Sequence, residues 1–170
     1  MSSPDSIRTY IQEQRPHFED MLGQMVETPS VSSDPDRAAD MQKMAELAMD
    51  HLEQFGARAA IVKTKGYPSV VGEWWAGRQY PSVTIYNHLD VQPAREPEWR
   101  QSPFAFHKDG DRYCGRGATD DKGPALTALF AARFAREAGI PLNIRMLWEL
   151  EEEIGSPNFS EVLRNRKTVP

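Results

Sequence analysis

Three groups of residues in this 170-residue sequence have side chains that could bind a metal ion or transfer a proton. The first group is His88 and Asp90, which directly follow an apolar run. On an extended chain, residues two positions apart point to the same side, so this carboxylate could orient the imidazole as a metal ligand. The alternative is a histidine at the end of a strand that makes only a local hydrogen bond.

The second group is a pair of adjacent carboxylates, Asp120 and Asp121, in the glycine-rich segment 115–123. The dipole of a following helix would stabilise both, so the pair could be a simple helix cap. The glycines also allow tight backbone turns, which would place a carboxylate more sharply than a cap requires. Metal binding and capping both remain open for this segment.

The third group is an acidic run formed by Glu149, Glu151, Glu152 and Glu153. Acidic runs are usually solvated surface. This run follows the largely apolar segment 144–148 without a turn, so its carboxylates would gather at the end of a buried strand and repel one another. A divalent cation would relieve that repulsion.

Together the groups offer one histidine, one aspartate and one or two glutamates on neighbouring strand ends. Mixed nitrogen and oxygen ligands suit zinc, with manganese as the second choice. Two ions sharing one carboxylate would form a hydrolytic centre with a bridging water. Outside these groups, His51 is expected to be a partly buried structural residue, and Cys114 a small buried one.

The elements that must position these groups form an α/β pattern. Apolar periodicity predicts a first helix from near Pro4 to before Thr28, with a kink or break at Pro16. A second helix is expected to begin at Asp34 and to end at Gly56. The remaining expected elements are strands at 59–62, 70–75 and 83–87, a long ordered loop at 89–111, a helix at 124–138, a strand at 142–148 and a short helix from about 156. Such an order predicts helices that cover a central sheet.

The charge and composition of the sequence argue against some classes of binding partner. The formal net charge is -5 and no basic stripe is present, which argues against a nucleic-acid partner. The single cysteine excludes an intrachain disulfide and suits a reducing compartment. Neither a secretory leader nor an apolar stretch of membrane-spanning length is visible, so we expect a cytoplasmic protein without a membrane partner.

The three groups, in this order and spacing, resemble the co-catalytic dinuclear zinc peptidases. That family includes carnosinase-type dipeptidases, carboxypeptidase G, aminoacylase, acetylornithine deacetylase and succinyl-diaminopimelate desuccinylase. The resemblance rests on the motifs Asn87-His88-Leu89-Asp90-Val91-Gln92-Pro93, Gly115-Arg116-Gly117-Ala118-Thr119-Asp120-Asp121-Lys122-Gly123-Pro124 and Glu152-Glu153-Ile154-Gly155-Ser156. The Asp-Asp-Lys-Gly-Pro and Val-Gln-Pro segments are most similar to the dipeptidase branch.

The resemblance implies a role for each matching residue. His88 would bind one metal ion and Asp90 would sit behind it and orient the ring. Asp120 would bridge both ions, and Glu153 would bind the second. Glu152 would be the general base. The family also has a cis peptide bond after the bridging aspartate, here between residues 120 and 121.

For the whole protein, the resemblance implies a three-layer α/β/α catalytic domain with a central mixed sheet. It implies hydrolysis of peptide or N-acyl amino acid amide bonds with two divalent ions, zinc in preference to manganese or cobalt. The family has two further metal ligands downstream and an inserted domain for dimer formation and substrate closure. Residues 1–170 would then be the incomplete N-terminal part of the catalytic domain, without the inserted dimerisation and lid domain and without the C-terminal catalytic segment.

We therefore expect this chain to bind metal weakly and to be inactive alone, with an exposed sheet edge, while the full-length protein forms a homodimer. One alternative is a non-catalytic interaction or regulatory module that keeps the fold. Another is a phosphate-binding α/β domain that uses the loop 115–123, although the acidic surroundings would repel anions.

Overall fold

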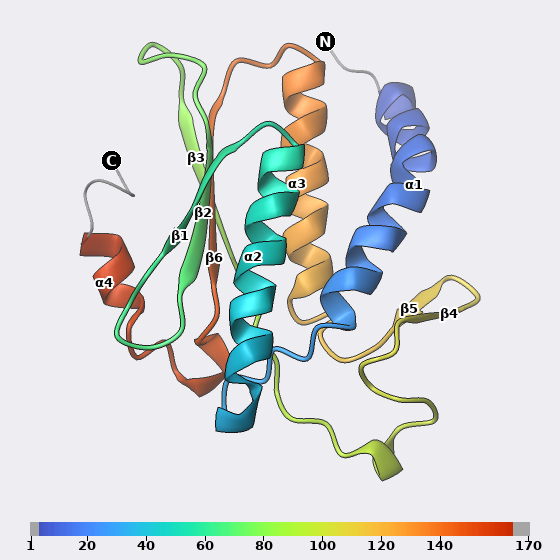
Figure 1. The fold of residues 1–170 in the computed structure, drawn as a ribbon. Coiled ribbons are helices and arrows are strands. Elements are labelled where there is room, and N and C mark those ends of the chain that lie inside the picture. The colour runs from blue at the N-terminus through green and yellow to red at the C-terminus, as the bar shows by residue number, and fades with distance from the viewer. Residues whose placement is uncertain (1–3, 165–170) are drawn as a thin grey trace.

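The computed structural model describes residues 4–164 of the chain. A four-stranded sheet lies between two helical layers (Figure 1). The helices α1, α2 and α3 cover one face, and the short helix α4 lies against the other. The expected three-layer α/β/α arrangement with a mixed sheet is confirmed.

The sheet brings the ends of two strands that are distant in sequence together. Its spatial order is β1 (Arg58–Val62), β2 (Ser69–Trp74), β6 (Asn143–Glu149) and β3 (Ser82–His88). The first three strands are antiparallel, whereas β3 runs parallel to β6 and pairs His88 with Glu149. Because parallel strands end at the same edge, the segments that follow β3 and β6 leave the sheet side by side.

The helices begin and end within a few residues of the predicted positions. They are α1 (Pro4–Val26), α2 (Ala38–Gln54), α3 (Lys122–Glu137) and α4 (Phe159–Arg164). A short 3-10 helix, η1 (Pro35–Arg37), precedes α2, and Asp34 caps it by accepting a hydrogen bond from the backbone N–H of Asp36. The core between α1, α2, α3 and the sheet contains fully buried apolar side chains from every layer: Leu22, Met25, Met44, Leu52, Leu126, Leu129, Met146 and Trp148.

Of the kink or break predicted at Pro16, the break is wrong, because α1 runs through this residue as one helix. A proline inside a helix removes one backbone donor and its ring clashes with the carbonyl four residues earlier, so other contacts must offset that cost. Each half of α1 is held against the rest of the molecule: Leu22 and Met25 are buried in the second half, and Tyr10 in the first half packs its ring on Phe134 and donates a hydrogen bond to the carbonyl of Phe130. Contacts with α3 therefore outweigh the local preference.

The segment 89–111 is more ordered than the predicted loop. It contains a 3-10 helix, η2 (Glu96–Glu98), and its end forms a hairpin from β4 (His107–Asp109) and β5 (Arg112–Cys114). Gly110 has a φ of 60° in the two-residue turn between them, which a glycine adopts easily. Each strand has only three residues, His-Lys-Asp in β4 and Arg-Tyr-Cys in β5. Such short runs cannot show the alternation of apolar and polar residues by which strands are predicted. Cys114 is half-buried rather than buried.

After β6 the chain forms a 3-10 turn, η3 (Glu152–Ile154), and then α4. Val162 of α4 is fully buried against Val62, Val71 and Leu147 on the second face of the sheet. None of the helices among residues 4–164 is long and apolar enough to cross a bilayer.

Candidate metal centre

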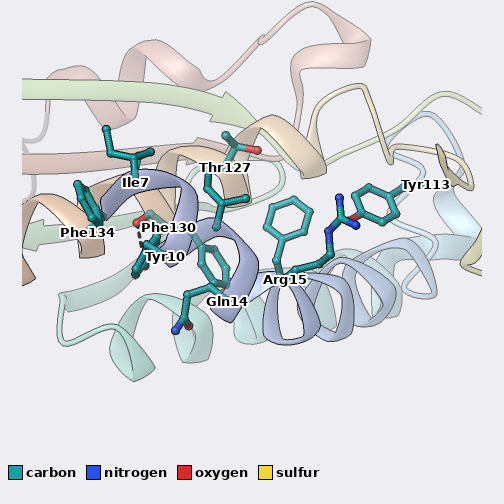
Figure 2. Close-up of a pocket in the computed structure, with 11 residues that line it drawn as sticks. Ile7, Tyr10, Gln14, Arg15, Tyr113, Thr127, Phe130 and Phe134 are labelled. Carbon is teal, nitrogen blue, oxygen red and sulfur yellow. Dashed lines mark hydrogen bonds between the residues drawn. The ribbon is translucent and has the colours of Figure 1, made fainter. Parts of the chain in front are cut away.

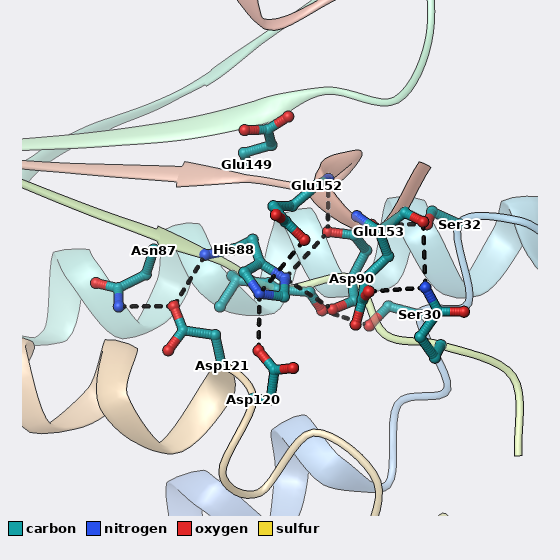
Figure 3. A network of polar contacts seen from close by, with 12 residues as sticks. Ser30, Ser32, Asn87, His88, Asp90, Asp120, Asp121, Glu149, Glu152 and Glu153 are labelled. Carbon is teal, nitrogen blue, oxygen red and sulfur yellow. Dashed lines mark hydrogen bonds and ion pairs between the residues drawn. The ribbon is translucent and has the colours of Figure 1, made fainter. Parts of the chain in front are cut away.

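The side chain of His88 occupies the end of β3, next to the end of β6 (Figure 3). Its Nε2 atom lies 3.0 Å from Oδ1 of Asp120 and 3.9 Å from Oε2 of Glu152. The imidazole is buried, whereas the side chains of Asp120 and Glu152 are 75% and 45% exposed. The site is thus a solvent-facing group of carboxylates around one buried imidazole.

Three predicted ligands converge at this place. One ligand atom each from His88, Asp120 and Glu153 can be chosen so that all three lie within 4.8 Å of one another. An imidazole nitrogen with two carboxylate oxygens is a donor set that zinc or manganese accepts. The predicted convergence is therefore observed, and the residues fit a divalent cation; their roles as ligands stay predictions.

The electrostatics of the site favour positive charge. Burial by itself lowers the pKa of His88, but the hydrogen bonds and charges of Asp90, Asp120 and Glu152 outweigh it and raise the pKa to about 9. The negative potential at the imidazole is thus large enough to overcome desolvation. The same potential would attract a cation.

Asp90 lies behind the imidazole, as predicted, and does more than orient it. Its side chain is fully buried, with Oδ1 3.5 Å from Nδ1 of His88, and its backbone carbonyl lies 3.1 Å from the same nitrogen. It also accepts hydrogen bonds from the backbone N–H of Glu152 at 3.1 Å and of Glu153 at 3.0 Å. Asp90 therefore contacts the ring with its backbone carbonyl and its carboxylate, and the same carboxylate holds the turn that carries the two glutamates.

Asp121 braces the site instead of capping a helix. It occupies the N-cap position of α3, but its side chain makes no capping hydrogen bond. Its Oδ2 accepts hydrogen bonds from Nδ2 of Asn87 at 2.8 Å and from the backbone N–H of His88 at 3.3 Å. The peptide bond between Asp120 and Asp121 is cis, which confirms the prediction from the resemblance.

The acidic run is divided between structure and site. Glu149 accepts a hydrogen bond from the Tyr86 hydroxyl at 2.7 Å, and burial raises the pKa of Glu149. Glu151 accepts from the backbone N–H of Tyr67 and from Nδ2 of Asn158. Of the four glutamates of the run, Glu152 and Glu153 face the His88 site, and one or two glutamates were expected there.

Two residues within the motifs, Lys122 and Gln92, make supporting contacts that the sequence did not predict. Lys122 is fully buried, and its Nζ donates to the carbonyls of Met25 at 2.9 Å and Thr28 at 3.0 Å. Gln92 donates from Nε2 to Oε2 of Glu153 at 2.8 Å. Both residues stand within the motifs, next to predicted ligands, but their partners lie over 60 residues away, so no local spacing indicated these contacts.

Comparison with known proteins gives a family match and relatives of one kind. A model of the family described as "Peptidase family M20/M25/M40" matches residues 84–169. The Cys-Gly metallodipeptidase dug1 of Schizosaccharomyces pombe is 33% identical over 177 residues, which cover 95% of this chain and 37% of the relative. The human Beta-Ala-His dipeptidase is 32% identical, with coverage of 84% and 31%. The chain thus spans about a third of the length of these relatives.

Solved structures agree with the fold. The crystal structure of human carnosine dipeptidase 1 superposes with a TM-score of 0.85 at 30% identity and covers 94% of this chain and 37% of its own. The metallo-carboxypeptidase Sso-CP2 from Sulfolobus solfataricus gives a TM-score of 0.78 at 33% identity, with coverage of 86% and 34%.

Proposed function

Because this chain belongs to peptidase family M20/M25/M40, we propose that it forms the N-terminal part of a metallopeptidase catalytic domain that hydrolyses dipeptides or N-acyl amino acids. The observation that carries the proposal is the convergence of His88, Asp120 and Glu153 at one edge of the sheet. Relatives named for Cys-Gly and β-Ala-His cleavage support a dipeptide as the substrate.

We propose two divalent ions, zinc in preference to manganese or cobalt. His88 would hold one ion, Glu153 the other, and Asp120, whose exposed carboxylate has two oxygens, would be shared. When bound, such ions polarise a scissile carbonyl and lower the pKa of a water molecule. This chain alone would supply few ligands to each ion, so we expect weak metal binding and no turnover from it.

In the proposed reaction one residue of this chain transfers protons and another keeps the reacting groups in place. Glu152 would accept the proton of the attacking water and return it to the leaving amine, and its exposed side chain near His88 can reach substrate. Asp90 would keep the imidazole and the turn of Glu152 in place through its buried contacts.

For the whole protein we propose a cytoplasmic homodimer, with an inserted dimerisation and lid domain and a C-terminal catalytic segment beyond this chain. The length of the relatives, of which this chain covers about a third, supports further domains. Neither a nucleic acid nor a membrane is proposed as a partner.

The test is hydrolysis of Cys-Gly and β-Ala-His with zinc or manganese by a longer protein that contains this chain. Glu152→Gln should lower kcat by about 10²-fold or more, the loss typical of a general base. Glu53→Gln, at an exposed position of α2, is the matched control. Unchanged turnover in the Glu152 variant would remove this residue from the proposed role, and metal-independent turnover would refute the metal centre.

A further inference from the structure

Two serines between α1 and η1 are buried against the segment that carries His88 and Asp90. The hydroxyl of Ser30 donates to the carbonyl of Leu89, and that of Ser32 donates to Oδ2 of Asp90; both distances are 2.6 Å. Only Ser32 thus reaches the carboxylate behind the imidazole, as Figure 3 shows.

The backbone holds Ser32 in this position. Val31 and Val91 form a parallel bridge, and the backbone N–H of Val91 donates to the carbonyl of Ser30 at 2.9 Å. The segment therefore lies beside the residues that follow His88, joined to them by one isolated bridge. This pairing places the backbone of Ser32 next to Asp90, and the serine is buried there.

The Asp90 carboxylate is surrounded on both oxygens. Oδ2 accepts from Ser32 and from the backbone N–H of Glu153, while Oδ1 accepts from the backbone N–H of Glu152 and faces Nδ1 of His88. The Ser32 hydroxyl makes the shortest of these hydrogen bonds, at 2.6 Å. Without it, the backbone N–H of Glu152 and that of Glu153 would be the remaining donors to the carboxylate, which would be held less tightly against the His88 ring and η3.

We propose that Ser32 is a positioning residue of the metal centre, which acts through Asp90 to fix the His88 imidazole and the turn that carries Glu152 and Glu153. The metal centre is that of the proposed function, whereas the positioning rests on the hydrogen bonds that join Ser32, Asp90 and the backbone of Glu152 and Glu153. Residues that hydrogen-bond to metal ligands, as Asp90 would, typically change metal affinity by about 10–100-fold when they are removed. Ser32 acts through Asp90, so we expect an effect at the lower end of that range, about tenfold.

The first test uses the metal-free chain and its amide hydrogen exchange, measured by NMR. Ser32→Ala should speed exchange of the Glu152 and Glu153 amides by about tenfold, the factor for a lost contact of about 1.4 kcal/mol. Ser30→Ala is the matched control, because it removes a hydrogen bond of equal length from an equally buried serine of the same segment. Ser32→Thr keeps the hydroxyl and should restore slow exchange.

The second test is titration of these variants with Zn²⁺ or Mn²⁺ by calorimetry, after circular dichroism has shown that each is folded. Ser32→Ala should bind the ion about tenfold more weakly than the Ser30→Ala and Ser32→Thr variants. Equal exchange at Glu152 and Glu153 in the two alanine variants, or equal metal affinity, would overturn the inference. Equal affinity of wild type and His88→Ala would instead refute the proposed metal centre, and the exchange experiment would then decide the role of Ser32 by itself.

Discussion

The four glutamates of the acidic run 149–153 lie in different environments at the end of β6. Glu149 and Glu151 are buried and accept hydrogen bonds from Tyr86 and Tyr67, whereas Glu152 and Glu153 turn toward His88. The division follows from where each side chain leaves the backbone as the strand becomes a 3-10 turn. Substitution of one glutamate should therefore affect the stability of the fold, and substitution of another the binding of metal.

Substitutions at positions 151 and 153 should separate structure from metal binding. Glu153→Gln should lower the affinity for Zn²⁺ by tenfold or more, because a neutral amide is a poor ligand, with little change in Tm. Glu151→Gln should lower Tm, because it weakens the contacts with Tyr67 and Asn158, and should keep the metal affinity. Calorimetric titration and thermal unfolding of both variants check this; a reversed pattern would contradict the assignment of the run.

His51 should make stability depend on pH. Its ring is 1% exposed, and neither ring nitrogen has a hydrogen-bond partner within the described residues. Burial, with a smaller contribution from His17, lowers the pKa to about 4, although the charges of Asp50 and Asp20 oppose this. Below the unfolded pKa near 6.5 the unfolded chain takes up a proton that the folded chain refuses, so folding stability falls as pH decreases toward 4.

The expected loss from His51 is about 2 kcal/mol between pH 7 and pH 5. His51→Leu should remove this part of the pH dependence and be neutral or stabilising at pH 7, because the orphaned ring nitrogens are gone. Urea unfolding at both pH values measures it, with His107→Leu, a less buried histidine, as the control. An unchanged difference between the two pH values in His51→Leu would show that the ring is not the source.

At the scale of elements, Lys122 fastens α3 to α1. It stands in the first turn of α3, one residue after the Asp120-Asp121 pair, and caps carbonyls at the end of α1. The C-terminal end of a helix carries partial negative charge, which an ammonium group stabilises. Burial nevertheless lowers the pKa of Lys122 to about 7, and the charge of Asp90 opposes that shift.

Gly117 shows how close this packing is. Its φ is +84°, and an added Cβ would lie 2.7 Å from Val91 and 3.1 Å from the Lys122 side chain. A residue other than glycine would be strained there and would push on the buried lysine. The glycine-rich segment thus serves the junction of α1, α3 and the site, in addition to the placement of Asp120.

Lys122→Met should therefore destabilise the fold by about 2–3 kcal/mol, because two buried carbonyls lose their donor. Lys43→Met, at an exposed position of α2, should change stability by less than about 0.5 kcal/mol. The free energy of unfolding in urea at pH 6, where the ammonium is charged, measures both. Equal stability of the two variants would show that these hydrogen bonds contribute nothing net.

At the scale of the whole molecule, β3 is an edge strand of the sheet formed by the described residues. Val83 and Tyr86 on this strand are 41% and 43% exposed. An open edge with apolar side chains can pair with another strand. This geometry agrees with the expected exposed sheet edge of a partial domain.

The chain should therefore self-associate through β3 at high concentration. Val83→Lys should reduce the associated fraction in sedimentation velocity, because a charge on an edge strand disfavours pairing. Ile11→Lys is the control, since Ile11 is 57% exposed on α1, away from the sheet edge. If Ile11→Lys, and not Val83→Lys, prevents association, the apolar groove beside α1 and α3 is responsible instead. That groove has a volume of about 430 Å³ and is lined by residues such as Ile7, Ile11 and Phe134 (Figure 2).

The sequence alone was sufficient to predict the α/β class, the four α-helices of the described residues and the four strands of the main sheet. The convergence of His88, Asp120 and Glu153 was expected from the resemblance of three motifs to a known family. The class and the elements depend on local information, namely apolar periodicity and turn residues. The errors were of the same origin, because a break at Pro16 is what local preference favours, and the three-residue strands β4 and β5 carry too little pattern to be seen.

Only the tertiary structure decided which partners hold the site together. The contact of Ser32 with Asp90 spans 58 residues, that of Asp90 with Glu152 spans 62, and that of Lys122 with Met25 spans 97. The first depends on the bridge between Val31 and Val91, the second on the parallel register of β3 and β6, and the third on the packing of α1 against α3. A hydrogen bond needs two atoms placed within a fraction of an ångström, and residue types along the chain do not contain that placement until the layers have packed.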